Sequence, residues 1–324
     1  MSRPLNVFSC AAVLAIGSAQ AAEADKYPTR PVRVITGSVG STSDQIARFT
    51  AQKLTERLGQ QFIVDNRAGA GGTIGTDIAA KSVPDGYTLT IAHAGTHVSA
   101  VSLFKNLPYD PVRDFAPISV LIKLPTILVA HPSVPANSVQ ELVALGKAKG
   151  GNAVTWGSAG AGTLSHLAGE LFVQVTGIKF LHVPYKGAGP ALTGLLSGET
   201  HFAFLSPVTA RTQLQAGKVK AFAVSTATRF PGTPDIQSAA EAGLPGMDAL
   251  AWFGIMAPAK TPQVIIVRLN KEINDSFSRP DVKEAVLKLG AVAAPTTPED
   301  MRNFLKAELA KWTPIIKGAG ITAQ

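Results

Sequence analysis

The chain has 324 residues, with 30 Lys and Arg against 22 Asp and Glu, and its single cysteine is Cys10. The formal charge of +8 is spread along the sequence, which argues against nucleic-acid binding because that function needs a clustered basic footprint. Cys10 lies in a segment that we expect to be removed, so the mature chain has no disulfide scaffold, thiol nucleophile or thiolate metal site.

The N-terminus has the pattern of an export signal. Arg3 is followed by an apolar stretch at 7–16 and then by Ala19-Gln20-Ala21, which fits cleavage after Ala21. The stretch is shorter than the ~20 apolar residues that span a bilayer. We therefore expect residues 1–21 to be a signal peptide and the mature protein to be periplasmic and not embedded in a membrane. A disordered or core N-terminus is the alternative.

The 303 residues that remain (324 less 21) exceed what one core usually organises, so two lobes are expected. Strand-length apolar segments alternate with helical patterns, which indicates an α/β fold whose lobes are mostly parallel sheets flanked by helices. The first group is a βαβαβ unit made of strand 32–35, helix 43–58, strand 62–64, helix 74–81 and strand 87–92. The second group has helices 139–149 and 164–175 among the strands 126–130, 154–156, 180–183, 202–205 and 221–224.

The last part of the chain is one strand followed by three helices. Strand 252–256 precedes helices 262–277, 280–289 and 298–317, which have no further strands of their own. They must pack on a sheet built earlier, so the chain returns to the first lobe. We expect lobe 1 to be 22–124 plus 248–324 and lobe 2 to be 125–247. Two hinge crossings, near 118–124 and 248–253, would then permit lobe closure. Two sequential domains are the alternative.

A turn of small and hydroxylated residues, 37–44, joins the first strand to its helix. Small residues let the backbone approach a ligand, and the free N–H groups at a helix start attract anions. Ser41, Thr42 and Ser43 add hydroxyl groups. The same residues also fit plain capping, with Ser41 as N-cap and Asp44 three residues later. A ligand contact and a cap can coexist, because the cap occupies only one donor.

A similar turn, 157–166, opens the long helix of the second group. The two glycine- and serine-rich helix starts, one from each lobe, should face each other across a cleft at the carboxyl ends of the strands. His166, in the first turn of that helix, is interpreted either as an anion donor or as a local hydrogen-bond partner. A third glycine-rich turn, 66–73, lacks the small sixth residue of a dinucleotide fingerprint, since Ile74 stands there. It is either a structural turn or a wall of the site.

Catalytic, cofactor and metal motifs are absent from the sequence. The order of residues 157–160 does not make a nucleophile elbow, and no phosphate-binding loop ending in Lys-Ser or Lys-Thr occurs. His93 and His97 are four residues apart with no acid beside them, so ordinary loop histidines are favoured over a metal pair. We expect no enzyme, although a hydrolase using Ser158 or Ser165 with His166 is the remote alternative.

Many short segments, in the same order along the chain, resemble those of the periplasmic substrate-binding components of tripartite tricarboxylate transporters, the Bug family. The resemblance covers about 27–320 and rests on segments 27–31 (YPTRP), 66–72 (NRAGAGG), 84–89 (PDGYTL), 106–111 (NLPYDP), 165–170 (SHLAGE), 182–187 (HVPYKG), 241–246 (EAGLPG) and 252–254 (WFG). It implies a Venus-flytrap fold of the type II kind, a small carboxylate ligand and integral-membrane transporter subunits as partners. A monomer is expected.

The resemblance and the turns together nominate residues that hold the ligand through backbone groups, hydroxyls and bridging waters. The candidates are Gly40, Ser41, Thr42, Ser43, Ala94, Gly95, Thr96, Ser158, Gly160, Thr163, Ser165, His166, Tyr185, Lys186 and Ser206.

Two departures from the family pattern bear on the ligand. Residues 37–44 lack the usual Pro and one Gly, and Leu205-Ser206 stands where many relatives carry Asp-Asn. The missing carboxylate argues against a ligand with an ammonium group. We expect a di- or tricarboxylate or an aromatic carboxylate, and a receptor that feeds a transporter. A sensor that feeds a signalling receptor is the alternative.

Overall fold

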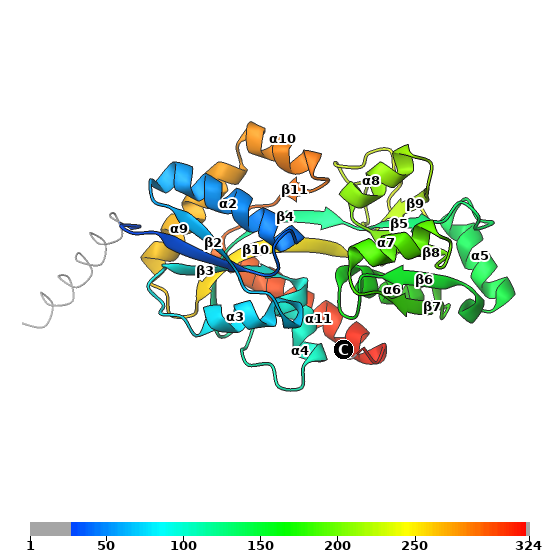
Figure 1. Ribbon diagram of the computed structural model, residues 1–324, viewed down its shortest axis with the longest axis horizontal. Helices are drawn as coiled ribbons and strands as arrows, with labels where there is room; N and C mark the ends of the chain where they lie inside the picture. Colours follow the sequence, from blue (N-terminus) through cyan, green and yellow to red (C-terminus); the bar gives the residue numbers. More distant parts are fainter. Residues whose placement is uncertain (1–26, 322–324) are drawn as a thin grey trace, which may run out of the picture.

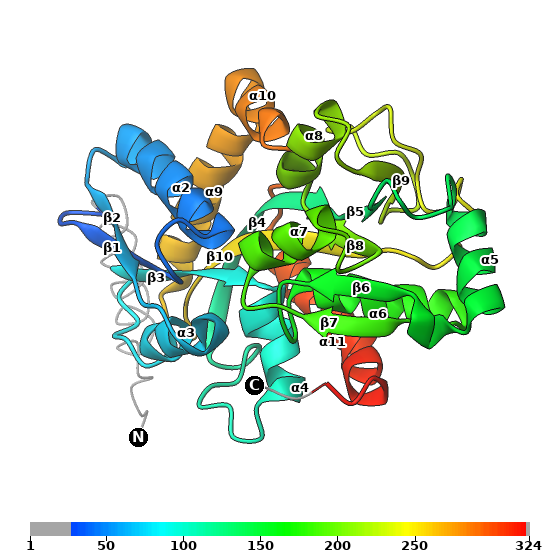
Figure 2. The ribbon, with the colours of Figure 1, turned by 45° about the vertical axis from the view of Figure 1, so that its right-hand side comes forward.

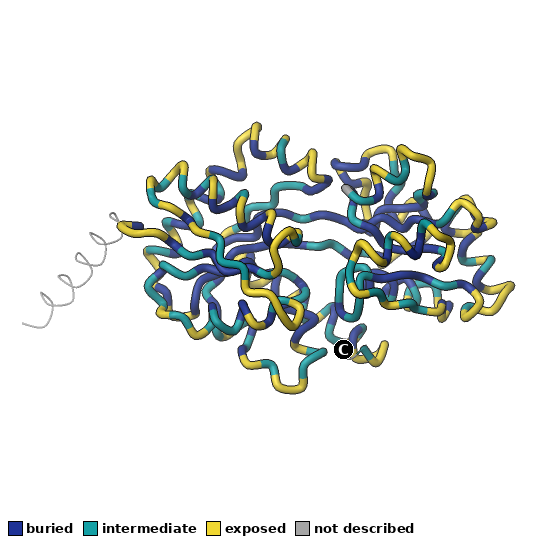
Figure 3. Tube along the Cα trace, in the orientation of Figure 1, coloured by how far each residue is buried: buried dark blue, intermediate teal, exposed yellow. Residues whose placement is uncertain are grey.

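A computed structural model describes residues 27–321, apart from the side chain of Val208. The predicted signal peptide, 1–21, lies outside the described residues. Two α/β lobes lie side by side, each with a sheet between helices (Figure 1). In both lobes most strand residues are buried, whereas the exposed positions lie mainly on the helices and the connecting loops (Figure 3). The predicted two-lobe α/β class is confirmed.

The first sheet has six strands in the order β11-β4-β10-β3-β1-β2. β1 pairs in parallel with β2 and β3, whereas β10 runs antiparallel to β3 and β4, and β11 antiparallel to β4. The strands are β1 (Val32–Thr36), β2 (Phe62–Asn66), β3 (Thr88–His93), β4 (Phe115–Pro125), β10 (Leu250–Pro258) and β11 (Val292–Ala293).

Helix α2 (Thr42–Leu58) shows how the first lobe forms from its sequence. Ile46, Ala47 and Leu54 recur at helical spacing and are buried against the sheet. Gly59 ends the helix in the left-handed conformation. The other helices of this lobe are α3 (Thr73–Ala80), α4 (Ala100–Leu103), α9 (Gln263–Phe277), α10 (Pro280–Lys288) and α11 (Pro298–Gly318), with short turns η1 (Ala70–Gly72) and η2 (Gly95–Ser99).

The second sheet has five strands in the order β7-β6-β8-β5-β9. β6 pairs in parallel with β7 and β8, while β5 runs antiparallel to β8 and β9. Its strands are β5 (Ile127–Ala130), β6 (Thr155–Ser158), β7 (Leu181–Pro184), β8 (Phe202–Leu205) and β9 (Lys220–Val224). Its helices are α5 (Val139–Lys149), α6 (Leu164–Thr176), α7 (Ala188–Leu196) and α8 (Pro207–Gln215), with the short turn η3 (Gly151–Ala153).

Both sheets are mixed, which corrects the prediction of mostly parallel sheets. Apart from the short β11, the antiparallel pairings involve the strands on either side of the crossings between lobes. β4 leaves the first sheet and continues as β5 in the second, and β10 brings the chain back between β4 and β3. Because β10 returns directly from the other lobe, without a crossover helix in its own, it enters the first sheet against the direction of β3.

The two crossings are joined by one buried serine. The backbone N–H of Thr126 donates to Ser225 Oγ at 2.9 Å, and that hydroxyl donates to the carbonyl of Ala249 at 2.6 Å. Helix α11 of the first lobe also extends to contact α6 of the second (Figure 2). The lobe limits expected from the sequence stay a prediction.

Candidate functional site

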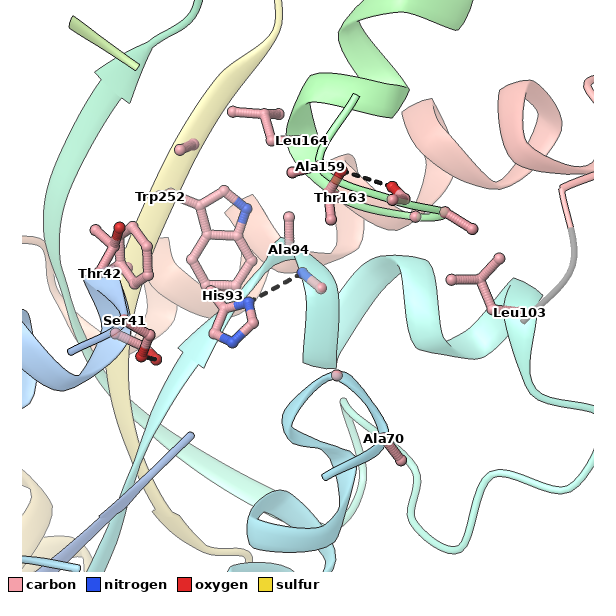
Figure 4. A pocket seen from close by; sticks show the side chains of 18 of the residues that line it. Ser41, Thr42, Ala70, His93, Ala94, Leu103, Ala159, Thr163, Leu164 and Trp252 are labelled. Atoms are coloured by element: carbon pink, nitrogen blue, oxygen red, sulfur yellow. Dashed lines mark hydrogen bonds between the residues drawn. The ribbon is translucent and has the colours of Figure 1, made fainter. Parts of the chain in front are cut away.

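A cleft of about 620 Å³ lies between the starts of α2 and α6. Its walls come from both lobes, with β10 and the end of β3 between them (Figure 4). A second cavity of about 310 Å³ on the side of the second lobe shares part of this lining. The residues common to both are Thr42, Ala159, Thr163, Leu164, Ala251 and Phe253.

Most of the residues nominated from the sequence come together at these two cavities. Ser158, Ser165 and Ser206 line only the smaller cavity. Gly40, Thr96 and His166 line neither. The residues that line the larger cleft are Ser41, Thr42, Ser43, Ala94, Gly95, Gly160, Thr163, Tyr185 and Lys186.

The start of α2 is tightly capped. The Asp44 N–H donates to Ser41 Oγ at 3.2 Å, as the sequence predicted, while the Ser41 hydroxyl donates to the Ser38 carbonyl at 2.7 Å. The Gly40 N–H donates to the Asp44 carboxylate at 2.9 Å. The backbone N–H groups of Thr42 and Ser43 have no acceptor among the described residues. These two groups are what α2 offers a ligand.

Asp44 is a buried carboxylate beside this anion-attracting turn. Burial raises its pKa, but hydrogen bonds from Asn66, Gly40 and Arg48 outweigh burial and hold the pKa below its ordinary value. Asn66 Nδ2 lies 2.8 Å from Asp44 Oδ1, and Arg48 Nε 3.1 Å from the same oxygen. The ionised Asp44 therefore fixes the turn, and Arg48 offsets its charge.

The start of α6 is organised differently, because its hydroxyls bond within the turn and cap nothing. Thr163, the N-cap, donates its hydroxyl to the Gly160 carbonyl at 2.7 Å, and Ser165 Oγ accepts from the Ala159 N–H at 3.0 Å. The backbone N–H groups of Leu164, Ser165 and His166 have no acceptor in the described part of the chain. Three donors thus remain at the N-terminus of a 13-residue helix.

Behind this turn, His166, Glu170 and His182 lie close enough together for a metal ion to be considered. His166 Nδ1 accepts the Gly162 N–H at 3.1 Å, and its Nε2 lies 3.4 Å from Glu170. Ser158 Oγ accepts the Gly160 N–H and shares a hydrogen bond of 2.7 Å with His182 Nε2, whose direction depends on the histidine tautomer. His166 Nδ1, which accepts a backbone N–H, keeps no free lone pair for a metal. These contacts support the turn.

The same contacts bear on the hydrolase alternative. His166 bonds neither Ser158 nor Ser165 in the described chain, so the nominated pairs do not form. Ser158 does contact His182, but burial and the neighbouring His166 lower the pKa of His182 to about 3, which makes it a weak base.

Thr96, also nominated from the sequence, is buried, and its hydroxyl bonds the His93 carbonyl and the His97 ring.

Two side chains nominated as ligand contacts, those of Tyr185 and Lys186, differ in what they present to the cleft. Tyr185 lines the cleft, but its hydroxyl is buried against Gly194 of α7. The contact is so close that a Cβ added to Gly194 would lie 2.0 Å from the hydroxyl oxygen. Lys186 is exposed and is the one charged side chain among the described residues that line either cavity. The positive character of the site therefore comes from Lys186 together with the two helix starts.

The sequence did not identify the apolar wall of the cleft or its histidine. Leu103, Phe104, Trp252 and Phe253 supply the apolar surface, and His93 lies beside Trp252 (Figure 4). A buried carboxylate fixes the position of Trp252. The indole N–H of Trp252 donates to Glu308 at 3.1 Å, and the same carboxylate oxygen accepts the indole N–H of Trp312. Such a wall suits the carbon skeleton of a ligand whose charged end meets a helix start.

No helix in residues 27–321 combines the length and the apolar character needed to cross a membrane.

Known proteins are similar to this chain over nearly its whole length. Protein BugT of Bordetella pertussis is 36% identical over 306 residues, which cover 94% of each chain. A solved structure of Rpa4515 from R. palustris with adipate is 34% identical with a TM-score of 0.82, and covers 91% of this chain and 99% of that one. MatC from Rhodopseudomonas palustris with bound malate is 32% identical with a TM-score of 0.77, and covers 90% and 100%.

Residues 46–321 match the family described as "Tripartite tricarboxylate transporter family receptor". Its members are solute-binding receptors rather than enzymes, in keeping with the expectation from the sequence. The chain belongs to the tripartite tricarboxylate transporter family receptors, the group that includes the Bug proteins.

Proposed function

We propose that this receptor captures a small organic anion, a di- or tricarboxylate or an aromatic carboxylate, by closing lobe 22–124 plus 248–324 against lobe 125–247. One observation carries the proposal: the free N–H groups of Thr42 and Ser43 in α2 and of Leu164 in α6 belong to residues that line one cleft from opposite lobes. Helix N-termini attract anions through free donors and the helix dipole. The adipate and malate bound by the two solved relatives support a carboxylate ligand here.

The energetics of this arrangement are adequate. A micromolar affinity corresponds to about −8 kcal/mol, and each charge-assisted hydrogen bond contributes roughly 1.5–3 kcal/mol. Several backbone donors from the two helices, with the apolar wall, reach that total. Closure follows only if the ligand makes more contacts in the closed form than in the open form. Donors shared between opposite lobes meet that condition.

The test removes one backbone donor at the start of α6. Leu164→Pro deletes the first free N–H, and the extended conformation of Thr163 is compatible with a following proline. The chain already starts α8, α10 and α11 with proline. Leu164→Ala is the matched control, since it shortens the same side chain and keeps the N–H.

We expect wild type to show a stoichiometric thermal shift with members of a carboxylate panel. By calorimetry, Leu164→Pro should bind the best ligand about tenfold more weakly than Leu164→Ala, as expected for one lost charge-assisted bond. Equal affinities of the two variants would remove α6 from the site. No thermal shift with any carboxylate would reject the function itself.

We further propose that the mature chain works as a periplasmic monomer, after removal of residues 1–21, and delivers its ligand to integral-membrane transporter subunits. The family name supports this partner. Uptake of the identified ligand should stop when either the receptor or the membrane subunits are deleted. Unchanged uptake with a lost transcriptional response to the ligand would favour the sensor alternative.

A further inference from the structure

His93 is the last residue of β3 and faces the cleft, although its sequence context favoured an ordinary loop histidine. It is half-buried and stands opposite Phe253 of β10, with the two ring centroids 5.8 Å apart. Figure 4 shows the imidazole below Trp252, between Ser41 and Ala94. The ring therefore belongs to the lining of the cleft that the two helix starts also border.

The hydrogen bonds of the ring fix its tautomer. Nδ1 accepts the backbone N–H of Gly95 at 3.1 Å, and a backbone N–H can only donate. The ring proton of the neutral imidazole therefore sits on Nε2. A Cβ on residue 95 would lie 2.9 Å from Cε1 of the ring, so glycine at this position lets the ring keep this pose.

The Nε2–H group has no partner among the described residues. It lies beside the glycine turn before α3, where a Cβ on Gly72 would be 3.8 Å away. Ala70 and Gly71 of the same turn also line the cleft. The donor thus lies beside the part of the cleft lining that this turn supplies, which is separate in the chain from the starts of α2 and α6. Its charge state agrees with this role, because burial lowers the pKa of His93 to about 4 and keeps the ring neutral at pH 7.

We infer that His93 is a specificity-determining residue, whose Nε2–H donates to a second acceptor group on the ligand while the first carboxylate meets the helix starts. This inference rests on the proposed function and narrows it to ligands with two separated acceptors. A closed cleft that leaves a buried donor unpaired is disfavoured, so a ligand with only one carboxylate forgoes this bond. The apolar wall between the two polar regions suits an unbranched or aromatic carbon skeleton.

The experiment compares adipate with hexanoate, which has the same six-carbon chain and lacks the second carboxylate. We expect wild type to prefer adipate by at least about tenfold, the effect of one hydrogen bond to a charged group. His93→Phe keeps an aromatic ring without a donor and should reduce this preference about tenfold. His93→Gln restores a donor near the position of Nε2 and should recover most of the preference. His93→Leu replaces His93→Phe should the latter fail to fold.

Three results would overturn the inference and leave the proposed function standing: a wild-type receptor that binds hexanoate as tightly as adipate, an unchanged preference in His93→Phe, or a preference that His93→Gln fails to restore. A wild-type receptor that binds no carboxylate at all rejects the proposed function, and the inference with it. Calorimetry gives the two affinities, and melting temperatures without ligand confirm that each variant is folded.

Discussion

The starts of α2 and α6 carry similar residues, but they distribute their hydrogen bonds differently. In α2, the Ser41 hydroxyl caps the Asp44 N–H, and the Asp44 carboxylate in turn holds the Gly40 N–H. In α6, the Thr163 hydroxyl turns back to the Gly160 carbonyl and caps no N–H group. The α2 turn is therefore rigid and offers two free donors, whereas α6 offers three.

The two turns also differ in what they face. Val39, at the tip of the α2 turn, is 74% exposed, and a Cβ on Gly40 would meet nothing within 4 Å. Gly162, in the α6 turn, lies against Leu103 of the first lobe. The α6 turn is thus the part of the site that already touches the opposite lobe. Under the proposed function, α2 would supply a preformed surface and α6 would couple ligand binding to closure.

Gly162→Ala should have the largest effect. With φ at 71°, alanine is strained by about 1–2 kcal/mol, and its Cβ would lie 2.2 Å from Leu103 Cδ1. Displacing Leu103 adds roughly 1–2 kcal/mol and disturbs the cleft wall. We expect a total loss of about 3 kcal/mol, divided between unfolding free energy and ligand affinity, as measured by urea denaturation and calorimetry.

Gly40→Ala is the matched control for this prediction. It imposes the same backbone strain, with φ at 77°, but contacts no neighbour. It should lose stability by about 1–2 kcal/mol from backbone strain and keep ligand affinity within a factor of three. If both variants lose affinity equally, the contact between the α6 turn and the first lobe has no role in closure.

Asp44→Asn should have the next largest effect, about 2 kcal/mol of unfolding free energy, because the ionised carboxylate accepts three charge-assisted or buried hydrogen bonds. The pKa of Asp44 is lowered in the folded state, so its stabilisation is complete above the unfolded pKa near 3.8 and is lost as pH falls through the folded pKa. The difference between wild type and variant, measured by urea denaturation, should therefore shrink below about pH 4.

Asp281→Asn tests whether any first-turn aspartate would behave alike. Asp281 lies in the first turn of α10 and pairs with Arg279, but both side chains are more than half exposed. Solvent screens such a pair, so we expect no measurable change in unfolding free energy. A loss as large as that of Asp44→Asn would show that the burial of Asp44 is not the cause.

The sequence predicted the fold wherever the pattern was local. Strand and helix limits from β1 to β3 agree within a few residues, since alternation and helical periodicity report burial directly. The segment 118–124 was interpreted only as a hinge, although it belongs to β4. The antiparallel pairing of β10 depends on where the chain re-enters the first sheet, and no local sequence pattern specifies the point of re-entry.

The site was predictable where backbone chemistry needs particular residues. Glycines and hydroxyls mark the starts of α2 and α6 in the sequence itself. The sequence did not identify His93, Leu103 and Trp252 as cleft residues. Whether these side chains face the cleft depends on how the two lobes meet, and the pattern of a single strand or helix does not specify that. The placement of Trp252 further depends on Glu308, more than fifty residues away.

The smallest expected effects are those of removing the hydroxyls of Ser41 and Thr163, one at each helix start. Ser41→Ala removes an N-cap and should destabilise the protein by about 1 kcal/mol, whereas Thr163→Ala removes only a turn bond and should lose about 0.5 kcal/mol. Affinity should respond in the opposite order. Without the Thr163 hydroxyl, the Gly160 carbonyl keeps only the 3.3 Å bond from the Thr163 N–H, which loosens the turn before the α6 donors, while Asp44 still holds the α2 turn. Urea denaturation and calorimetry on both single variants test this. A larger affinity loss in Ser41→Ala than in Thr163→Ala would reverse the roles given to the two helix starts.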